Sequence, residues 1–373
     1  MARVAGTRLT ASQKVAWLRL IRTENVGPVT FRQLLRRAGS AEQAILDLPG
    51  LASRVGVGTQ IPTVSAAEDE IASVEKLGGR FVALGEPDYP TLLGYIADAP
   101  PLLSVVGGER LRLDQAVSIV GARNASAAGQ RMTEILAKGL GAAGLTVVSG
   151  LARGIDTAAH KAALLTGTAA VLAGGIDQIY PEENIPLARA VLEHGGMLIS
   201  EMPYGWQPRA QDFPRRNRIV AGLALGVVVV EAAKRSGSLI TARLALEQDR
   251  EVFAVPGSPL DPRAEGVNHL IQQGARLVTS AEDVIEGLSR PGPTPSGLLE
   301  PDWEQDFEPS AGLEPGSGDR ARLMEALSVT PVPVDNLVTT AGLPVSTVQT
   351  LLLELDLAGR IEWSSGQLVA LKP

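Results

Sequence analysis

The sequence predicts an α/β protein whose central part, about residues 81–288, folds as a doubly wound, extended Rossmann-like and mostly parallel sheet. Apolar β-branched runs recur along this part, and each run up to Val230 is followed by a stretch with helical spacing. Near-continuous apolar strands that alternate with helices are typical of a parallel sheet covered on both faces. We expect the strands at 117–120, 146–148, 169–172, 197–199, 227–230 and 252–255.

Composition narrows the remaining classes of protein. The chain has 373 residues, 45% of them apolar, which is enough for two or three domains. It contains no cysteine and only three scattered histidines, so a disulfide, a thiolate nucleophile or a multi-histidine metal site is not expected. No apolar run approaches the roughly 18 residues of a membrane span, and no signal-peptide pattern opens the chain. We therefore expect a cytoplasmic protein without a bound metal.

Residues 1–80 form a predicted small helical domain. The segments SQKVAWLRLIR, TFRQLLRRAG and AAEDEIASVEKLGG carry apolar residues at helical spacing. Between the first two lies ENVGPVT, a Gly-Pro turn that is similar to the corner of a helix-hairpin-helix. Such a corner can present backbone N–H groups to a phosphate, and a simple helix corner fits the same residues equally well.

The C-terminal part of the chain divides at an acidic segment. Residues 289–318 are rich in Pro, Gly and acids and are typical of a flexible linker, whereas 319–373 predict three helices and a two-stranded hairpin about a Ser-Ser-Gly turn, as in a winged helix. The candidate recognition helix, 345–356, contains no Lys or Arg, and residues 319–373 hold four basic against six acidic side chains. A helix that binds duplex phosphates should be basic, so a protein contact is the favoured role.

The predicted strand ends share Gly and Ser. Ligands of such sheets bind outside the carboxyl ends of the strands, where glycine allows close approach and the next helix N-terminus favours an anion. The strongest case is SGSLIT, with Ser236, Gly237 and Ser238 ahead of a helix. A dinucleotide cofactor is disfavoured because Arg123 and Ser126 stand where the Rossmann fingerprint needs glycine. A GxxxxGK[ST] loop is absent as well, so no cofactor is expected.

The segment FPRRNRIVAG places a local cluster of arginines in a chain of formal charge −7. Arg215 and Arg218 are three apart and share a helix face, whereas Arg216 points elsewhere and is expected to be structural. Arg123 can bind a phosphate bidentately, with a structural ion pair as the alternative. Phe213 is either a platform for a nucleobase or a core residue. Together these residues predict a basic track for a charged polymer on an acidic protein.

Five ordered segments resemble the DNA-processing protein A (DprA/Smf) family over about residues 80–285. They are VSIVGARNAS, VSGLARGIDTAAHKAAL, LAGGIDQIYPEEN, DFPRRNRIVAGLALGVVVVEA and SGSLITARLALEQDREVFAVPGSPLDPRAEGVNHLIQQGA. The SAM-like helical N-terminus and the winged helix also fit the longer members. The resemblance implies a homodimer that binds single-stranded DNA and loads the RecA recombinase onto it, chiefly in natural transformation.

The resemblance also implies site residues. The DNA site would comprise Gly121, Arg123, Ser149, Gly150, Phe213, Arg215, Asn217, Arg218, Lys234, Ser236, Gly237 and Ser238. The dimer contact would lie around Asn268, Leu270, Ile271 and Leu277.

An enzyme is the main alternative to a binding protein. Glu201 and Glu231 follow two predicted strands, and a carboxylate pair could hydrolyse a nucleoside monophosphate. His160 lies four residues after Asp156 and could be an oriented base. The carboxylates could equally anchor loops by accepting backbone N–H bonds, and Asp156 falls in a first helical turn where a negative charge is favourable. We therefore expect no catalytic activity.

Overall fold

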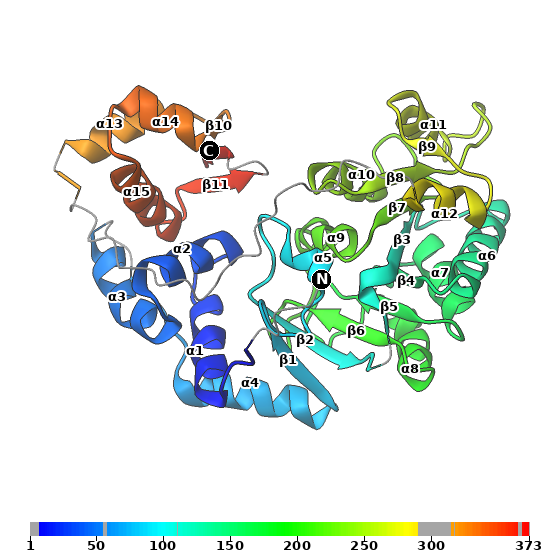
Figure 1. Cartoon of the computed structure of the whole chain (residues 1–373), viewed down its shortest axis with the longest axis horizontal. Coiled ribbons are helices and arrows are strands. Elements are labelled where there is room, and N and C mark those ends of the chain that lie inside the picture. Colours follow the sequence, from blue (N-terminus) through cyan, green and yellow to red (C-terminus); the bar gives the residue numbers. More distant parts are fainter. Residues whose placement is uncertain are drawn as a thin grey trace.

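The structure is a computed structural model that describes residues 7–54, 58–109, 111–289, 315–316, 318–364 and 368–372. Figure 1 shows a helical N-terminal part in blue, a large sheet with helices on both faces, and a small C-terminal part in orange and red. The predicted fold class, an α/β sheet with a helical N-terminus and a winged helix, is confirmed. Most of the predicted linker over 289–318 and the tip of the predicted hairpin lie outside the described residues.

A nine-stranded sheet with the order β1-β2-β6-β5-β4-β3-β7-β8-β9 forms the centre of the molecule. All neighbours from β6 to β9 are parallel, whereas β1 pairs with β2 and β2 with β6 in antiparallel fashion. The two strands that close the sheet toward the N-terminal helices, β1 and β2, and the edge strand β9 were not predicted. The strands are β1 (Gly79–Ala83), β2 (Leu102–Gly107), β3 (Ala116–Val120), β4 (Thr146–Ser149), β5 (Thr168–Val171), β6 (Met197–Ser200), β7 (Gly226–Val229), β8 (Glu251–Ala254) and β9 (Arg276–Leu277).

Helices cover both faces of this sheet because alternate residues of its strands enter two separate cores. In β7, Val227 and Val229 belong to one core and Val228 to the other. Helices α9, α10 and α11 pack into the first core, and α6, α7 and α12 into the second. The helices are α5 (Thr91–Gly94), α6 (Ala127–Ala142), α7 (Ile155–Ala163), α8 (Ile185–Glu193), α9 (Asp212–Gly222), α10 (Gly237–Glu247), α11 (Glu265–Gln272) and α12 (Ala281–Ser289).

Strand order reverses at β3, which lies between β4 and β7. The connections after β3 and after β7 therefore leave in opposite directions along the sheet. Such a switch point opens a crevice at the carboxyl ends of the strands, which is where ligands bind in open α/β sheets. The turn after β3, the N-terminus of α10 and the start of α9 are thus candidates for one site.

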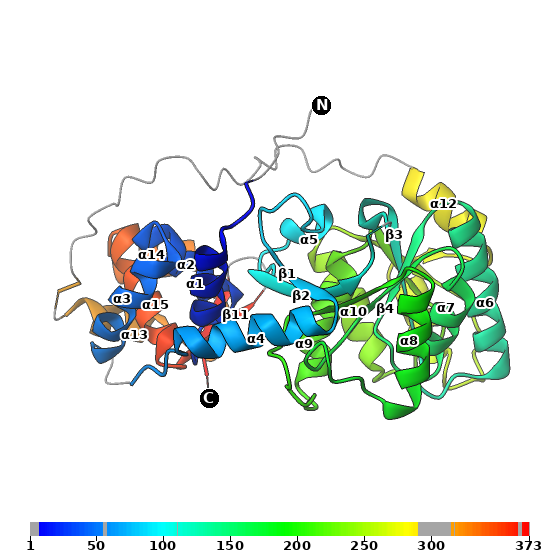
Figure 2. The same ribbon diagram turned by 90° about the horizontal axis from the view of Figure 1, so that it is seen from below.

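Four helices form the N-terminal part: α1 (Ala11–Ile21), α2 (Pro28–Ala38), α3 (Ala41–Ser53) and α4 (Val64–Lys76). Thr10 begins α1 in a capping box with Gln13, because its hydroxyl accepts the Gln13 N–H while the Gln13 side chain accepts the Thr10 N–H. Pro28 follows Gly27 as the first residue of α2, where its missing N–H costs no hydrogen bond. Figure 2 shows α4 extending from these helices along the sheet.

The winged helix packs on the N-terminal helices through its candidate recognition helix. Leu353 and Leu357 of α15 join the N-terminal core, and Thr30 of α2 donates a 2.5 Å hydrogen bond to Asp356. Buried Glu354 lies 3.7 Å from Arg54 and also binds Arg320. These contacts are made within the chain, and the role of the winged helix as a contact for another protein stays a prediction. The elements are α13 (Asp319–Ala326), β10 (Val332–Pro333), α14 (Val334–Ala341), α15 (Val345–Leu357), β11 (Ile361–Ser364) and β12 (Leu368–Leu371).

His160 of α7 is fully buried and joins this helix to β5. Its Nδ1 lies 2.7 Å from the Thr168 hydroxyl, which itself donates to the Val147 carbonyl, so Nδ1 is the donor of the pair. Burial, with a smaller effect of the Arg216 charge, lowers the pKa of His160 from 6.5 to about 3. The histidine therefore packs as a neutral group, and His160 has no access to a substrate.

We predict that His160 makes the protein less stable in acid. Between pH 6.5 and about 3 the unfolded chain binds a proton that the folded chain does not. The free energy of unfolding should therefore decrease as the pH is lowered through this window, by up to about 1.4 kcal/mol per pH unit. Urea unfolding of wild type and His160→Asn across this range measures the difference. Parallel pH profiles for the two proteins would show that the imidazole is not held neutral.

Candidate nucleic-acid interface

Three side chains from separate segments meet beyond the carboxyl ends of β3 and β5. The Arg123 guanidinium lies 5.1 Å from the centroid of the Phe213 ring, over its face. Tyr180, in the loop that follows β5, packs edge-on against Phe213 with ring centroids 5.4 Å apart. We call these three residues the Phe213 cluster. Arg123 is exposed, and Phe213 is half-buried.

Helix α9 links the Phe213 cluster to the start of α10. Asn217 donates a 3.4 Å hydrogen bond to the Gly237 carbonyl. Ser236 is the N-cap of α10, and its hydroxyl lies 2.8 Å from that of Ser238. The structure therefore brings the β3 turn, α9 and the Ser236–Ser238 segment together along one edge of the sheet. Ser238 is buried, so Ser236 and Gly237 are the members of this segment that a ligand can reach.

Two of the candidate glycines are required by packing. A Cβ on Gly121 would lie 2.6 Å from the Ile155 side chain, and one on Gly150 would lie 2.5 Å from the Arg216 guanidinium. Ser149 is fully buried, and its hydroxyl donates a 2.6 Å hydrogen bond to the Ile119 carbonyl. The predicted DNA site includes Ser149, whose hydroxyl is not free for a ligand because it connects two strands.

Arg216 is buried beneath this edge, as the sequence analysis expected of a structural residue. Its guanidinium donates to the Gly150 and Val171 carbonyls, at the ends of β4 and β5. Burial lowers its pKa to about 10, partly offset by the Asp156 carboxylate. Asp156 accepts the Gly150 N–H at 3.1 Å, and burial raises the pKa of its carboxyl although Arg216 opposes the shift. Asp156 thus holds a turn rather than a substrate.

Arg215 and Arg218 share a helix face, as predicted, and they converge on Glu201. The Arg215 Nε lies 2.8 Å from one carboxylate oxygen of Glu201, and Arg218 binds the other. Arg218 also lies 3.2 Å from Asp98, and its side chain is buried. The prediction that Arg218 faces DNA is therefore wrong, because two carboxylates hold it inside. Arg215 keeps about half of its side chain exposed (47%).

Glu231 anchors the start of α6, which confirms one of its two predicted roles. Its carboxylate accepts the Ser126 N–H at 2.9 Å and the Ser126 hydroxyl at 2.5 Å. Glu201 differs from expectation, because its carboxylate binds arginines rather than backbone N–H groups. A cavity of about 370 Å³ lies beside Glu231, and its lining includes Ser126, Pro256 and Asp261 but no Lys, Arg or His. Such a lining does not favour an anionic nucleotide.

The remaining predicted residues lie on or near the β9 edge of the sheet. Lys234 is exposed and lies 3.3 Å from Glu265. Asn268 of α11 binds both the N–H and the carbonyl of Gly257. Leu270 belongs to the core, so its predicted place in a dimer contact is wrong. Ile271 is partly buried against the same core, whereas Leu277 of the edge strand β9 is 48% exposed.

None of the helices in the described part of the chain is long and apolar enough to cross a membrane. Within the same residues, His, Asp and Glu side chains do not gather in threes as the ligands of a metal ion would.

Comparison with known proteins agrees with the geometry. A family model described as DNA recombination-mediator protein A matches residues 80–289, a DprA-like N-terminal helix-hairpin-helix domain matches 11–73, and a DprA winged helix domain matches 307–367. The chain belongs to the DprA/Smf family. Protein Smf of Escherichia coli is 37% identical over 366 residues, which cover 95% of each chain. The DprA of Bacillus subtilis is 44% identical over 58% of this chain and 74% of its own.

Two solved structures of DprA proteins share this fold. The crystal structure from Streptococcus pneumoniae has a TM-score of 0.61 and 36% identity, and covers 75% of this chain and 98% of its own. The structure from Helicobacter pylori, described for its single-stranded DNA binding mode, has a TM-score of 0.51 and 29% identity over 56% of this chain and 95% of its own.

Tyr180 and Trp206 are the members of this edge that the sequence analysis missed. Tyr180 packs against Phe213, and the indole of Trp206 lies under the guanidinium of Arg209 at 4.5 Å. Both aromatic residues stand in loops that directly follow strands of the sheet. An aromatic residue in a loop that follows a strand was the available signal for both. Each could have been considered, like Phe213, as either a platform for a nucleobase or a core residue.

We predict that Glu201→Gln destabilises the protein strongly. The change removes the charge that balances buried Arg218 and leaves it with Asp98, which is 44% exposed. Removing one partner of a buried pair costs about 3–5 kcal/mol, whereas exposed pairs contribute about 0–1 kcal/mol. Urea unfolding should show a small loss for Arg215→Ala and a large one for Glu201→Gln. Equal small losses would mean that the Arg218 charge is compensated elsewhere.

Proposed function

We propose that the protein binds single-stranded DNA without sequence preference along the edge defined by Arg123, α9 and Ser236. The observation that carries the proposal is the Phe213 cluster, in which an exposed guanidinium lies over the face of an aromatic ring. Base stacking on an aromatic ring tolerates any base, and the neighbouring guanidinium supplies a phosphate contact. The single-stranded DNA binding described for the Helicobacter pylori relative supports the same substrate.

The ion pairs of this edge distinguish Arg123 from the other candidate arginines. Arg215 and Arg218 bind Glu201, and Arg216 binds backbone carbonyls. Among the described residues, the Arg123 guanidinium has no carboxylate partner. Its charge is therefore available to a phosphate without the loss of an existing ion pair. We assign the main phosphate contact to Arg123 and a weaker one to Arg215.

Arg123→Ala should weaken binding and reduce its dependence on salt. Each phosphate contact to a single strand contributes about −0.7 to the slope of log K against log salt concentration. Oligothymidine titrations at several salt concentrations should therefore show a slope flatter by about 0.7 in this variant. Arg112→Ala, which changes an exposed arginine at the opposite end of β3, should leave both the affinity and the slope unchanged. An unchanged slope in Arg123→Ala would remove the phosphate contact from the proposal.

Phe213→Ala should weaken binding by a different physical route. Loss of one stacked base costs about 1–3 kcal/mol and leaves the salt slope nearly unchanged, because no phosphate contact is lost. Phe213→Tyr keeps an aromatic face and should bind nearly as wild type. The same oligothymidine titrations give both the affinity and the salt slope. If Phe213→Ala binds like wild type, the ring is only a packing residue.

We further propose that the bound strand is protected and then passed to RecA in the cytoplasm during natural transformation, with the protein acting as a homodimer. This part rests on the resemblance to the family. The exposed Leu277 on edge strand β9, next to α11, supports a dimer contact there. Analytical ultracentrifugation of Leu277→Asp tests the contact, and a RecA strand-exchange assay with coated single strands tests loading. A monomeric wild type would contradict the proposed homodimer.

A nucleoside monophosphate hydrolase is less well supported. Both oxygens of Glu231 are occupied by Ser126, and Asp156 and His160 are buried. Release of free base from a nucleoside monophosphate by wild type but not by Glu231→Gln would establish the enzyme. Duplex binding through α15 is likewise disfavoured, because that helix packs on the N-terminal helices.

A further inference from the structure

The loop between β6 and α9 carries a second pair of an arginine and an aromatic ring. The Arg209 guanidinium lies 4.5 Å from the centroid of the Trp206 ring, and Arg209 is exposed. No described residue forms an ion pair with this guanidinium. The pair therefore repeats the composition of Arg123 and Phe213, an uncompensated charge over an aromatic face.

The indole of Trp206 is fixed by the first residue of α9. Its Nε1 donates a 2.9 Å hydrogen bond to the Asp212 carboxylate, which also accepts the Arg209 N–H at 2.8 Å. Asp212 is buried and directly precedes Phe213 in the chain. Consecutive Cα atoms are about 3.8 Å apart, so the anchor of Trp206 and the ring of Phe213 belong to the same helical turn.

A second connection runs through the loop that follows β5. The Gly175 N–H donates a 2.9 Å hydrogen bond to the Trp206 carbonyl, and Gly205 donates at 2.8 Å to Asp177. The same loop ends at Tyr180, which packs against Phe213. Tyr180 and the Trp206–Arg209 pair thus lie on connected loops at the carboxyl ends of β5 and β6, and Tyr180 joins these loops to the Phe213 ring.

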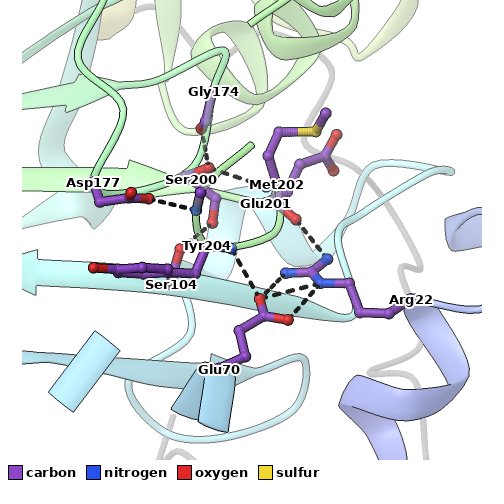
Figure 3. Close-up of polar contacts among 10 residues, drawn as sticks. Arg22, Glu70, Ser104, Gly174, Asp177, Ser200, Glu201, Met202 and Tyr204 are labelled. Atoms are coloured by element: carbon purple, nitrogen blue, oxygen red, sulfur yellow. Dashed lines mark hydrogen bonds and ion pairs between the residues drawn. The ribbon is translucent and has the colours of Figure 1, made fainter. Parts of the chain in front are cut away.

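Residues of the N-terminal helices also bind the loop between β6 and α9, as Figure 3 shows. Arg22 donates to the Glu201 carbonyl at 3.0 Å and pairs with Glu70 at 2.9 Å, while Glu70 accepts the Tyr204 N–H at 3.2 Å. Both charged side chains are largely buried, at 13% and 14% exposure. The loop is therefore fixed before any ligand arrives, which lowers the entropy lost on binding.

We propose that Trp206 and Arg209 form a second base-stacking site, which extends the bound single strand from the Phe213 cluster toward the N-terminal helices. This inference rests on the proposed function. A nucleobase would stack on the exposed part of the Trp206–Arg209 pair, since bases stack on aromatic rings and on guanidinium planes alike. Arg209 would also contact a phosphate of the same strand.

Oligothymidines of increasing length test the second site. Trp206→Ala should weaken binding of the longer oligomers about 5- to 150-fold, as expected for one stacked base, and spare the shortest ones that still bind. Arg209→Ala should also flatten the salt slope by about 0.7, whereas Arg209→Lys should keep the slope and lose part of the affinity. Arg112→Ala serves as the control for an exposed arginine elsewhere.

Fluorescence gives a readout that does not depend on affinity. Oligothymidine should quench part of the tryptophan emission of wild type, and Trp206→Phe should lose this quenching while it still binds, because a phenyl ring also stacks. If Trp206→Ala and Arg209→Ala bind like wild type at every length while Phe213→Ala binds weakly, the second site is wrong and the proposed function stands. If Phe213→Ala and Arg123→Ala also bind like wild type, the proposed function fails as well.

Discussion

The buried guanidinium of Arg216 is the contact on which the geometry of this edge depends. It joins α9 to the carbonyls of Gly150 and Val171, at the ends of two neighbouring strands. Those carbonyls lie where the parallel ladder stops, so a donor from elsewhere must satisfy them. Because Arg216 supplies it, α9 lies across the strand ends. Phe213, Arg215 and Asn217 are then placed on the surface by the turn of the helix.

One short segment contains three arginines whose roles differ because their surroundings differ. Arg216 meets backbone carbonyls and is buried, and Arg218 meets two carboxylates and is buried with them. Arg215 reaches the same Glu201 from the surface and stays half-exposed. A guanidinium at a surface acts on a ligand only as far as its charge is not already balanced. Arg123 and Arg209 are exposed beside aromatic rings and have no carboxylate partner among the described residues, which makes them strong candidates for phosphate.

The sequence was sufficient for the central strands of the sheet, because these depend on local patterns. Apolar runs marked the strands from β3 to β8, and Gly, Ser and Arg marked their carboxyl ends. Helical spacing also separated Arg216 from Arg215 and Arg218. It could not show that Arg218 is buried, since that depends on Asp98 and Glu201, which are distant in the chain. Nor could it show that the Ser149 hydroxyl is used between strands, or that Leu270 faces the core.

An acidic chain can leave guanidinium groups unpaired at one edge because several of its carboxylates are committed to internal contacts. Glu201 binds two arginines, Glu231 caps α6 through Ser126, and Asp212 holds Trp206. In the winged helix, Glu354 is buried between Arg54 and Arg320. A strand that approaches the edge of the sheet therefore meets exposed guanidinium groups, while these carboxylates are already paired. Local pairing, rather than the net charge of −7, decides where a polyanion can bind.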